Sequence, residues 1–280
     1  MDPRAAGRIA RSLETLHAFG YFAPEVVEEL TALGLRKGRM CYFASRSAPM
    51  GAVTAGTVAA TFFVFNPELV ERQLGQAWTL AAPEEVTAAR YRGISRAWGR
   101  LLGDVNPDEL AEAAELARTV ALACSVAGRP LSAAHAGLEW PSEPHLVLFH
   151  ALTVVREHRG DGHVAALLGE GLSGLEALVT HTATGHGFTV PAAQVTRGWS
   201  EEEWGATAAD LVERGVLTPQ GGLTDAGRDL RRRVEQATDR NAVAPWEALG
   251  EEGAHRLAEL GRPWVRQAIA SGAYPEGVFA

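Results

Sequence analysis

The feature that most constrains this chain is an internal repeat. Residues 20–74 align without a gap with residues 162–216. The identical pairs include Pro49 and Pro191, Val53 and Val195, Thr54 and Thr196, and Gly56 and Gly198, and the run Leu69–Arg72 is repeated as Leu211–Arg214. Because self-similarity of this kind marks a duplicated module, we expect two copies of one fold, with a pseudo-two-fold interface at which both halves can contribute to a site.

The length and composition allow a large hydrophobic core. The chain has 280 residues, of which 46% are hydrophobic, and this suits two domains or one duplicated domain. No apolar run reaches the roughly 18 residues that span a bilayer, and the first residues, Met1-Asp2-Pro3-Arg4, lack a signal-peptide pattern. These observations predict a globular, cytoplasmic protein with no membrane partner.

The charge balance is acidic. The formal net charge is −8, with 34 Asp and Glu residues against 26 Lys and Arg residues. Phosphate contacts supply most of the non-specific affinity for nucleic acids, and they need a concentrated positive surface. Net acidity therefore counts against a nucleic-acid partner, although it is compatible with a local basic patch.

Apolar residues at helical spacing predict a mainly α protein. Asn66-Pro67-Glu68 is a strong helix start, since it supplies an Asn cap, a first-turn proline and an acid. Strand signals are weak and short. The expected helices cover residues 4–17, 24–35, 83–102, 107–126, 144–158, 163–180, 200–214, 224–238 and 246–270.

A stretch that contains glycines and prolines, residues 127–143, is expected to link the two copies. This predicts a first winged-helix-like half at residues 1–126 and a second half, with a C-terminal helix, at residues 144–280. A fused pair of modules can satisfy a dimer interface inside one chain. The repeat therefore favours a pseudo-dimer within one chain, with a monomer as one oligomeric state open to it.

The second half has the element order of a winged helix. Residues 211–217 end a helix, residues 218–222 turn at Gly-Gly, and residues 223–230 open the next helix. These stretches resemble winged-helix proteins of the multiple-antibiotic-resistance-regulator (MarR) type, whose wing is followed by Leu-Thr-x-x-Gly. The resemblance covers roughly residues 190–270. It implies a tandem, internally duplicated and degenerate winged-helix fold with small β-wings.

The whole chain also resembles a family of actinobacterial proteins of about this length that are described only as helix-turn-helix proteins. Residues 42–49, Tyr-Phe-Ala-Ser-Arg-Ser-Ala-Pro, and residues 157–163, Glu-His-Arg-Gly-Asp-Gly-His, carry the resemblance. It implies the architecture and no particular activity.

Neither copy offers a good DNA-reading helix. The helix expected to read DNA in the second copy, residues 201–214, carries five acids against one arginine, and acids facing phosphate are repulsive. The corresponding stretch of the first copy, Thr61–Phe65, is so apolar that we expect it to pack inside the protein. The DNA-reading surfaces are therefore predicted to be degenerate.

Residues 145–163 hold four of the nine histidines. We expect Gly160 and Gly162 to reverse the chain and Asp161 to cap a helix that begins near His163. Such a turn gathers imidazole, carboxylate and guanidinium groups suited to acid–base chemistry or to gripping an anion. The candidate catalytic residues are His150, His158 and His163.

The remaining candidates bind a ligand in a cleft between the halves. His17 and Tyr21 in the first copy align near His158 and His163 in the second, so these helix starts can face one another. The candidate ligand-binding residues are His17, Tyr21, Tyr42, Arg46, Glu157, Arg159 and Asp161.

Structural interpretations of the same residues stay open. His150 also suits a core histidine, and Arg46 suits a bridge between the copies. Glu157 and Arg159 can form a solvated ion pair worth less than about 1 kcal/mol. The histidine spacings match no common zinc pattern, so no metal site is predicted.

Three functions follow from these observations. The first is a cytoplasmic protein that binds a small organic molecule between its halves, with acid–base catalysis by histidine as an option. The second is a MarR-like, ligand-responsive transcription regulator. The third is a non-catalytic interaction module that uses its acidic helices. The sequence contains no nucleotide-binding signature, and it identifies no cofactor.

Overall fold

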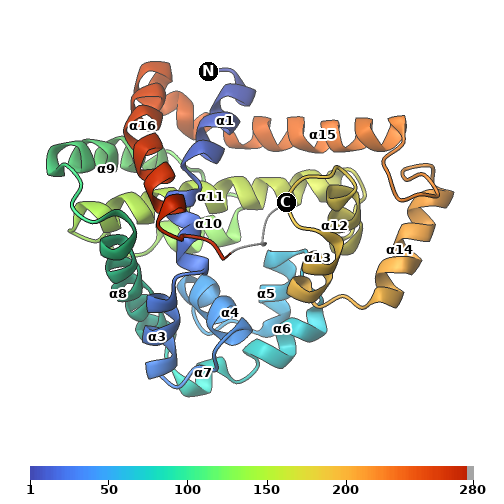
Figure 1. The fold of residues 1–280 in the computed structure, drawn as a ribbon, viewed down its shortest axis with the longest axis horizontal. Coiled ribbons are helices and arrows are strands. Elements are labelled where there is room, and N and C mark those ends of the chain that lie inside the picture. The colour runs from blue at the N-terminus through green and yellow to red at the C-terminus, as the bar shows by residue number, and fades with distance from the viewer. Residues whose placement is uncertain (276–280) are drawn as a thin grey trace. The chain divides into compact units, whose positions relative to one another are not determined.

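The computed structural model, which describes residues 1–275, is mainly helical (Figure 1). Over this range no β-strand is formed, and a single isolated antiparallel bridge joins Leu217 and Leu223. The prediction of a mainly α protein is confirmed. The predicted β-wings are not seen as strands, and the bridge marks the one place where two extended segments meet within the described residues.

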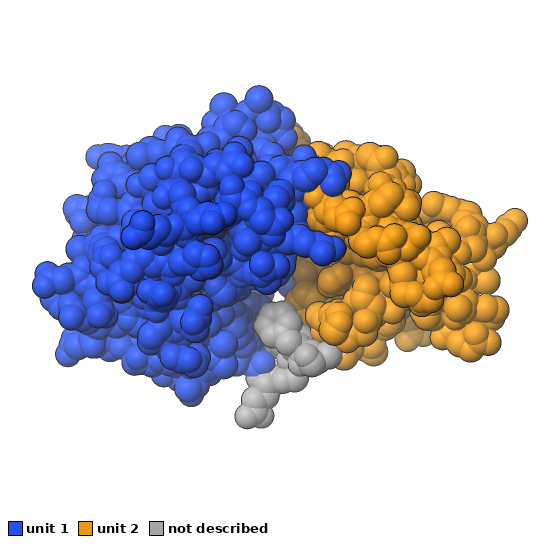
Figure 2. Space-filling view, turned by 90° about the horizontal axis from the view of Figure 1, so that it is seen from above, with its two compact units in different colours: residues 1–53, 76–162, 239–275 blue, residues 54–75, 163–238, 276–280 orange. Residues whose placement is uncertain are grey.

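The chain divides into two compact units, each assembled from separate segments (Figure 2). Within the described residues, unit 1 contains residues 1–53, 76–162 and 239–275, and unit 2 contains residues 54–75 and 163–238. These units do not follow the predicted halves at 1–126 and 144–280. The predicted linker, residues 127–143, contains a short helix, α10 (Pro130–Ala136).

Most helices belong to one unit. Unit 1 contains α1 (Pro3–Leu13), α2 (Thr15–Ala18), η1 (Phe19–Tyr21), α3 (Pro24–Ala32), α4 (Arg39–Ser47), η2 (Ala48–Met50), α7 (Ala77–Leu80), α8 (Pro83–Leu102), α9 (Pro107–Leu122), α10 and α16 (Ala244–Ala270). Unit 2 contains α5 (Ala55–Phe62), α6 (Pro67–Leu74), α12 (Gly174–Thr182), α13 (Val190–Arg197) and α14 (Glu201–Glu213). The helices α11 (Pro144–Gly169) and α15 (Asp225–Ala242) each contribute residues to both units.

Local capping explains where many of these helices begin. The side chain of Asn66 accepts a hydrogen bond from the amide of Glu68 at the start of α6, as its sequence predicts. Asn106 caps α9 in the same way, and a proline occupies the first turn of both helices. The predicted bounds 83–102 agree with α8, and α16, which contains the helix predicted over 246–270, is interrupted at Gly250.

The predicted chain reversal at residues 160–162 is wrong. α11 runs without a break from Pro144 to Gly169. Gly162 lies where its neighbours approach closely, because a Cβ atom there would be 2.6 Å from Nη1 of Arg129 and 3.1 Å from Cβ of Asn241. Glycine costs only about 1 kcal/mol relative to alanine inside a helix, and the close packing explains why a helix accepts it here.

The core of unit 1 is built around aromatic side chains. Phe19, Phe43 and Phe149 are almost fully buried, and the ring centroids of Phe19 and Phe149 lie 6.0 Å apart. Helix α3 packs along α8, and α16 packs along both α1 and α9. This core fixes the positions of the polar side chains that α2, α4 and α11 bring into the same unit.

The repeated segments adopt different structures. Leu211-Val212-Glu213 ends α14, whereas the matching Leu69-Val70-Glu71 lies inside α6. Pro191 lies in the first turn of α13, whereas Pro49 lies in the short helix η2. The duplication therefore stays a prediction from the sequence. None of the helices within residues 1–275 is long and apolar enough to span a bilayer.

Candidate functional site

Unit 2 contains two helices joined by a tight turn. α13 ends before Gly198, and α14 begins after Ser200. Gly198 has φ of 78°, and a Cβ atom there would lie 2.8 Å from Cβ of Leu69, so both the backbone and the space favour glycine. Ser200 and Glu203 form a capping box, with N···O distances of 2.9 and 3.1 Å. A short turn that contains glycine is the usual connection of a helix-turn-helix.

An apolar core joins these two helices to α12. Trp204 and Leu211 of α14 are buried, and they pack in one cluster with Ala193 of α13 and with Leu178 and Val179 of α12. Helix α12 contacts both α13 and α14. The helices on both sides of the turn are thus held by a small three-helix core.

The segment between α5 and α6 anchors the turn from within the same unit. The indole Nε1 of Trp199 donates to the carbonyl of Val64 at 2.9 Å, and the amide of Asn66 donates to the carbonyl of Arg197 at 2.9 Å. Phe65 is buried, in agreement with the prediction that residues 61–65 pack inside the protein. The guanidinium of Arg197 lies 4.8 Å from the centroid of the Phe65 ring.

A reduced hairpin follows α14. Leu217 and Leu223 form the isolated bridge, and the amide of Thr218 donates to the carbonyl of Gly222 at 2.7 Å. The next residue after the bridge, Thr224, donates its amide to the carbonyl of Val216 at 3.1 Å. The helix end, turn and next helix expected over residues 211–230 are present, with the hairpin shortened to this bridge, and α13 precedes them where no helix was predicted.

The charges of unit 2 are unevenly distributed. The exposed acids of α14 are Glu201, Glu202, Glu203, Asp210 and Glu213. The first part of α15 instead carries three exposed arginines, Arg228, Arg232 and Arg233, whose side chains are 58%, 54% and 53% exposed. Each of the three pairs with an acid, respectively Asp225, Asp229 and Glu170. Acids therefore dominate the surface of α14, whereas the exposed arginines of α15 lie beside acids that pair with them.

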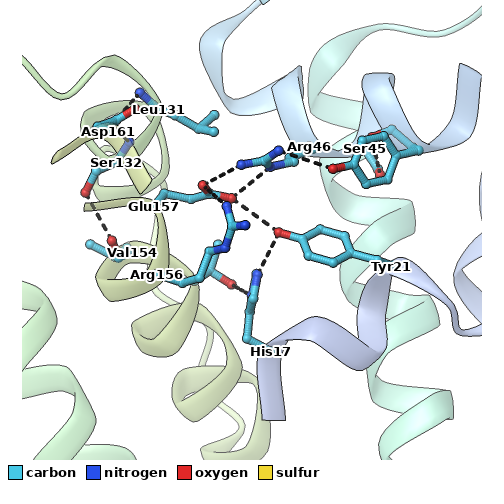
Figure 3. Close-up of polar contacts among 12 residues, drawn as sticks. His17, Tyr21, Ser45, Arg46, Leu131, Ser132, Val154, Arg156, Glu157 and Asp161 are labelled. Carbon is cyan, nitrogen blue, oxygen red and sulfur yellow. Dashed lines mark hydrogen bonds and ion pairs between the residues drawn. The ribbon is translucent and has the colours of Figure 1, made fainter. Parts of the chain in front are cut away.

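Unit 1 contains a buried polar cluster centred on Glu157 (Figure 3). Arg46 of α4 grips the Glu157 carboxylate with two hydrogen bonds, Nε to Oε1 at 3.0 Å and Nη2 to Oε2 at 2.8 Å. Nη1 of Arg156 also donates to Oε2 at 2.7 Å. The hydroxyl of Tyr42 accepts from Nη1 of Arg46 at 3.2 Å. Two guanidinium groups therefore meet one buried carboxylate.

A histidine and a tyrosine extend this cluster. Nδ1 of His17 lies 2.9 Å from Oγ1 of Thr153, and Thr153 donates its own proton to the carbonyl of Phe149 at 2.8 Å. The proton between His17 and Thr153 is thereby assigned to Nδ1 of His17, which leaves Nε2 as an acceptor. Nε2 lies 2.7 Å from the Tyr21 hydroxyl, which also lies 3.3 Å from Oε1 of Glu157.

The electrostatics of the cluster fix its protonation. Burial acts to raise the pKa of Glu157, but the charges of Arg156 and Arg46 outweigh it and hold that pKa well below its usual value. Burial, together with the charge of Arg90, holds the pKa of His17 well below 6.5. Burial raises the pKa of Tyr21 to about 12. These groups keep one protonation state near neutral pH, which suits a structural anchor better than acid–base catalysis.

The three predicted catalytic histidines have separate surroundings. Nδ1 of His150 lies 2.5 Å from the hydroxyl of Tyr91. His163 belongs to unit 2, where its Nδ1 lies 2.8 Å from Oγ1 of Thr238. Burial lowers the pKa values of His150 and His158 to about 4. Both imidazoles are therefore neutral near pH 7.

Asp161 and Arg159 have structural partners. Oδ2 of Asp161 accepts from the amides of Leu131 and Ser132 at 3.1 and 2.9 Å, so it caps α10 and not a helix that begins at His163. Nη1 of Arg159 donates to Oδ1 of Asp239 at 2.8 Å. The alternative of a solvated pair between Glu157 and Arg159 is wrong, because Glu157 is buried against Arg46 and Arg156.

A small cavity lies beside the cluster. Its lining includes His17, Arg11, Arg156, Arg159 and Trp246, and its volume is about 150 Å³. This volume accommodates a few water molecules or a small ion. Among residues 1–275, no three His, Cys, Asp or Glu side chains are grouped as metal ligands would be.

The sequence interpretation missed Arg156, Thr153 and Tyr91. Of these, Thr153 could have been found from spacing alone, because other members of the cluster are four positions apart on helical segments. Thr153 and Glu157 repeat the spacing of Tyr42 and Arg46 and of His17 and Tyr21. A continuous α11 had to be recognised first. Tyr91 reaches His150 from a distant part of the sequence, and no local pattern indicates this pair.

Comparisons with curated proteins and with solved structures find no match. A family model described as a helix-turn-helix family matches residues 6–275. This match overturns the prediction that argued against a nucleic-acid partner, because the helix-turn-helix is a motif through which proteins dock to DNA. Net acidity describes the whole chain, and it does not exclude a contact between DNA and the exposed arginines of α15. Since the match covers more than half of the chain, the protein belongs to the helix-turn-helix family.

Proposed function

We propose that this protein is a DNA-binding regulator that contacts DNA through unit 2. The observation that carries the proposal is the pair α13 and α14, joined at Gly198 and supported by the core of Trp204 and Leu211. The order from α12 to α15 further supports the predicted MarR-type winged helix, with its wing reduced to the bridge between Leu217 and Leu223.

The affinity for DNA comes mainly from α15. Arg228, Arg232 and Arg233 occupy one short stretch of this helix, and each side chain is more than half exposed. An exposed ion pair contributes little to protein stability, so exchanging its acid for a DNA phosphate costs little. Three phosphate contacts would add a strong dependence of the affinity on salt concentration. The acidic face of α14 opposes this attraction and limits the affinity.

The proposal is tested by binding of fluorescent duplexes that tile the region upstream of the protein's own gene. Fluorescence anisotropy at about 50 mM salt, followed by a salt titration, measures affinity and its salt slope. We expect the triple variant R228A/R232A/R233A to bind at least about tenfold more weakly and to reduce the magnitude of the salt slope by roughly 3. Circular dichroism establishes that the variant is folded.

The matched control removes three arginines from unit 1. Arg92, Arg96 and Arg256 have side chains that are 55%, 52% and 45% exposed and are also paired with acids, so R92A/R96A/R256A makes the same change in net charge. This control should bind DNA nearly as the unmodified protein does. Absence of binding to every duplex at low salt, or an equal loss in both triple variants, would contradict the proposal.

The acidic face of α14 favours a second function, docking of a basic protein surface. Its exposed acids are Glu201, Glu202, Glu203, Asp210 and Glu213, and they lie on a helix that the core of unit 2 holds in place. In that case charge removal from α14 weakens partner binding, whereas it strengthens DNA binding under the first proposal. The two functions therefore predict opposite signs for the same change.

A further inference from the structure

A cleft of about 600 Å³ lies in unit 1, away from the Glu157 cluster. Its lining includes Pro49, Tyr91, Leu138, Trp140, Pro141 and Leu146. These residues come from η2, α8, the segment after α10 and the start of α11. Its volume lies within the range of small-molecule sites, about 300–1,000 Å³, and such sites combine apolar walls with a few placed polar groups.

Tyr91 lines the cleft, and its hydroxyl is paired with a buried histidine; the other polar lining residues are Glu84, Thr87 and Glu139. Nδ1 of His150 lies 2.5 Å from this hydroxyl, and Nε2 of His150 is buried without a hydrogen-bond partner among the described residues. An unpartnered buried N–H is rarer than an unpartnered acceptor. The favoured tautomer therefore places the proton on Nδ1, where it is donated to the oxygen of Tyr91.

This tautomer leaves the proton of Tyr91 available for another acceptor. Burial raises the pKa of Tyr91 to about 12, so the hydroxyl stays protonated near neutral pH and can act as a donor. Since Tyr91 lines the cleft, the acceptor can belong to a molecule bound there. His150 acts as a positioning residue, because it holds the tyrosine oxygen.

Aromatic packing also holds Trp140, another residue of the lining, in place. The rings of Trp140 and His150 meet edge to face, with centroids 4.6 Å apart. The guanidinium of Arg118 lies 4.9 Å from the centroid of the Trp140 ring. These contacts fix the orientation of the Trp140 ring, against which a flat apolar molecule can pack.

The charges of the lining select against anions. Glu84 and Glu139 are its charged members, and both are exposed. Among the described residues that line the cleft, none is a lysine, an arginine or a histidine. A carboxylate ligand would thus face two acids with no lining cation to neutralise it.

We propose that this cleft binds an uncharged aromatic molecule whose carbonyl oxygen accepts a hydrogen bond from Tyr91. The site is separate from the surface of unit 2, and binding to it is measured without DNA. Its success or failure therefore does not depend on the DNA-binding proposal.

Three probes of one shape test the proposal: 2-acetylnaphthalene, naphthalene and 2-naphthoate. Their affinities for the full chain are measured by ligand-observed NMR titration. We expect 2-acetylnaphthalene to bind about 5- to 10-fold more tightly than naphthalene, the gain of one hydrogen bond, and 2-naphthoate to bind most weakly. Equal binding of the ketone and the hydrocarbon, or tightest binding of the anion, would overturn the proposal without any variant.

Two variants locate the binding. Tyr91→Phe should abolish the preference for the ketone while naphthalene still binds, and Trp140→Leu should weaken all three probes. Tyr274→Phe is the matched control in the same unit, and it should keep the preference. A preference that persists in Tyr91→Phe, or that is lost equally in Tyr274→Phe, would place the probe elsewhere and reject the cleft.

Discussion

The Glu157 cluster of unit 1 and the arginines of α15 in unit 2 differ in how far their charges are buried. In the cluster, Glu157 is 1% exposed and lies against Arg46 and Arg156. On α15, the side chains of Arg228 and Arg232 are 58% and 54% exposed. A buried charge must be paired within the fold, whereas an exposed one can change partners at little cost. We therefore expect the Glu157 cluster to act as a structural anchor, and we propose that the exposed arginines of α15 contact a partner.

The strongest test of this contrast removes the carboxylate of the buried cluster. Glu157→Gln keeps the size of the side chain but leaves the guanidinium groups of Arg46 and Arg156 without their counter-charge. Breaking a buried pair from one side costs about 3–5 kcal/mol. We expect a loss of this size in the free energy of unfolding, measured with chemical denaturant.

The matched control is Glu112→Gln, which removes an exposed carboxylate that pairs with Arg256 at 2.7 Å. It should leave the unfolding midpoint unchanged within error. Equal effects of the two substitutions would mean that burial does not distinguish the ion pairs, and the contrast between buried and exposed charges would fail.

A pH titration should reveal the next largest effect. Burial lowers the pKa of His135 to about 3 and those of His150 and His158 to about 4, and it holds that of His17 well below 6.5. Below pH 6.5 these histidines become protonated in the unfolded chain, whereas they stay neutral in the folded chain. We therefore expect the free energy of unfolding to fall by roughly 2–3 kcal/mol between pH 7 and pH 6.

One group opposes this loss of stability at low pH. Burial raises the pKa of Asp161 to about 6, so between its unfolded value of 3.8 and pH 6 the folded chain binds the extra proton and stability falls as pH rises. The four histidines together lower the stability at acidic pH by more than this one carboxyl raises it. In His150→Gln the loss of stability between pH 7 and pH 6 should shrink, and an unchanged loss would show that this imidazole is not held neutral by burial.

Substitution of two glycines in unit 2 should change the stability by smaller amounts and in opposite directions. Gly198→Ala should destabilise the protein by about 1–3 kcal/mol, because alanine disfavours φ of 78° and its Cβ would crowd Leu69. Gly205→Ala lies inside α14, where nothing is within 4 Å of the added Cβ, and should stabilise it by about 0.5–1 kcal/mol. Thermal unfolding compares the two. Equal shifts of Tm would show that the turn does not require glycine.

The sequence predicted helices best where a local signal determines them. The Asn66 cap and the bounds of α8 could be predicted because capping and first-turn proline act within a few residues. The break at residues 160–162 was wrong because tertiary packing overrides the weak helix propensity of glycine. The association of residues 54–75 with residues 163–238 in unit 2 depends on long-range contacts, and a pattern in the sequence does not contain them.

The candidate site could also be predicted only in part. Of the seven residues predicted to bind a ligand, the structure brings His17, Tyr21, Tyr42, Arg46 and Glu157 into one polar cluster, whereas Arg159 and Asp161 have other partners. Their chemistry was not predictable, since it depends on burial that fixes each protonation state. The counter-charge from Arg156 is adjacent in sequence to Glu157, a spacing that on an exposed helix would not indicate a contact.

The smallest expected effect is the most direct test of how unit 2 uses its surface. Glu201→Gln with Glu202→Gln removes two exposed charges from the first turn of α14 and leaves the capping box of Ser200 and Glu203 in place. If α14 faces DNA phosphates, the loss of repulsion should tighten binding about two- to threefold at low salt, and the gain should shrink as salt screens the charges.

The same exchange in unit 1, Glu84→Gln with Glu85→Gln at the start of α8, changes the net charge equally and should leave DNA affinity unaltered. Tighter DNA binding by both double variants would reflect net charge alone, because a general reduction of repulsion does not depend on where the acids lie. Weaker DNA binding after the change in α14 would show that its acids contribute contacts of their own. The acidic helix would then be the contact surface of unit 2, and the role assigned to the arginines of α15 would have to be given up.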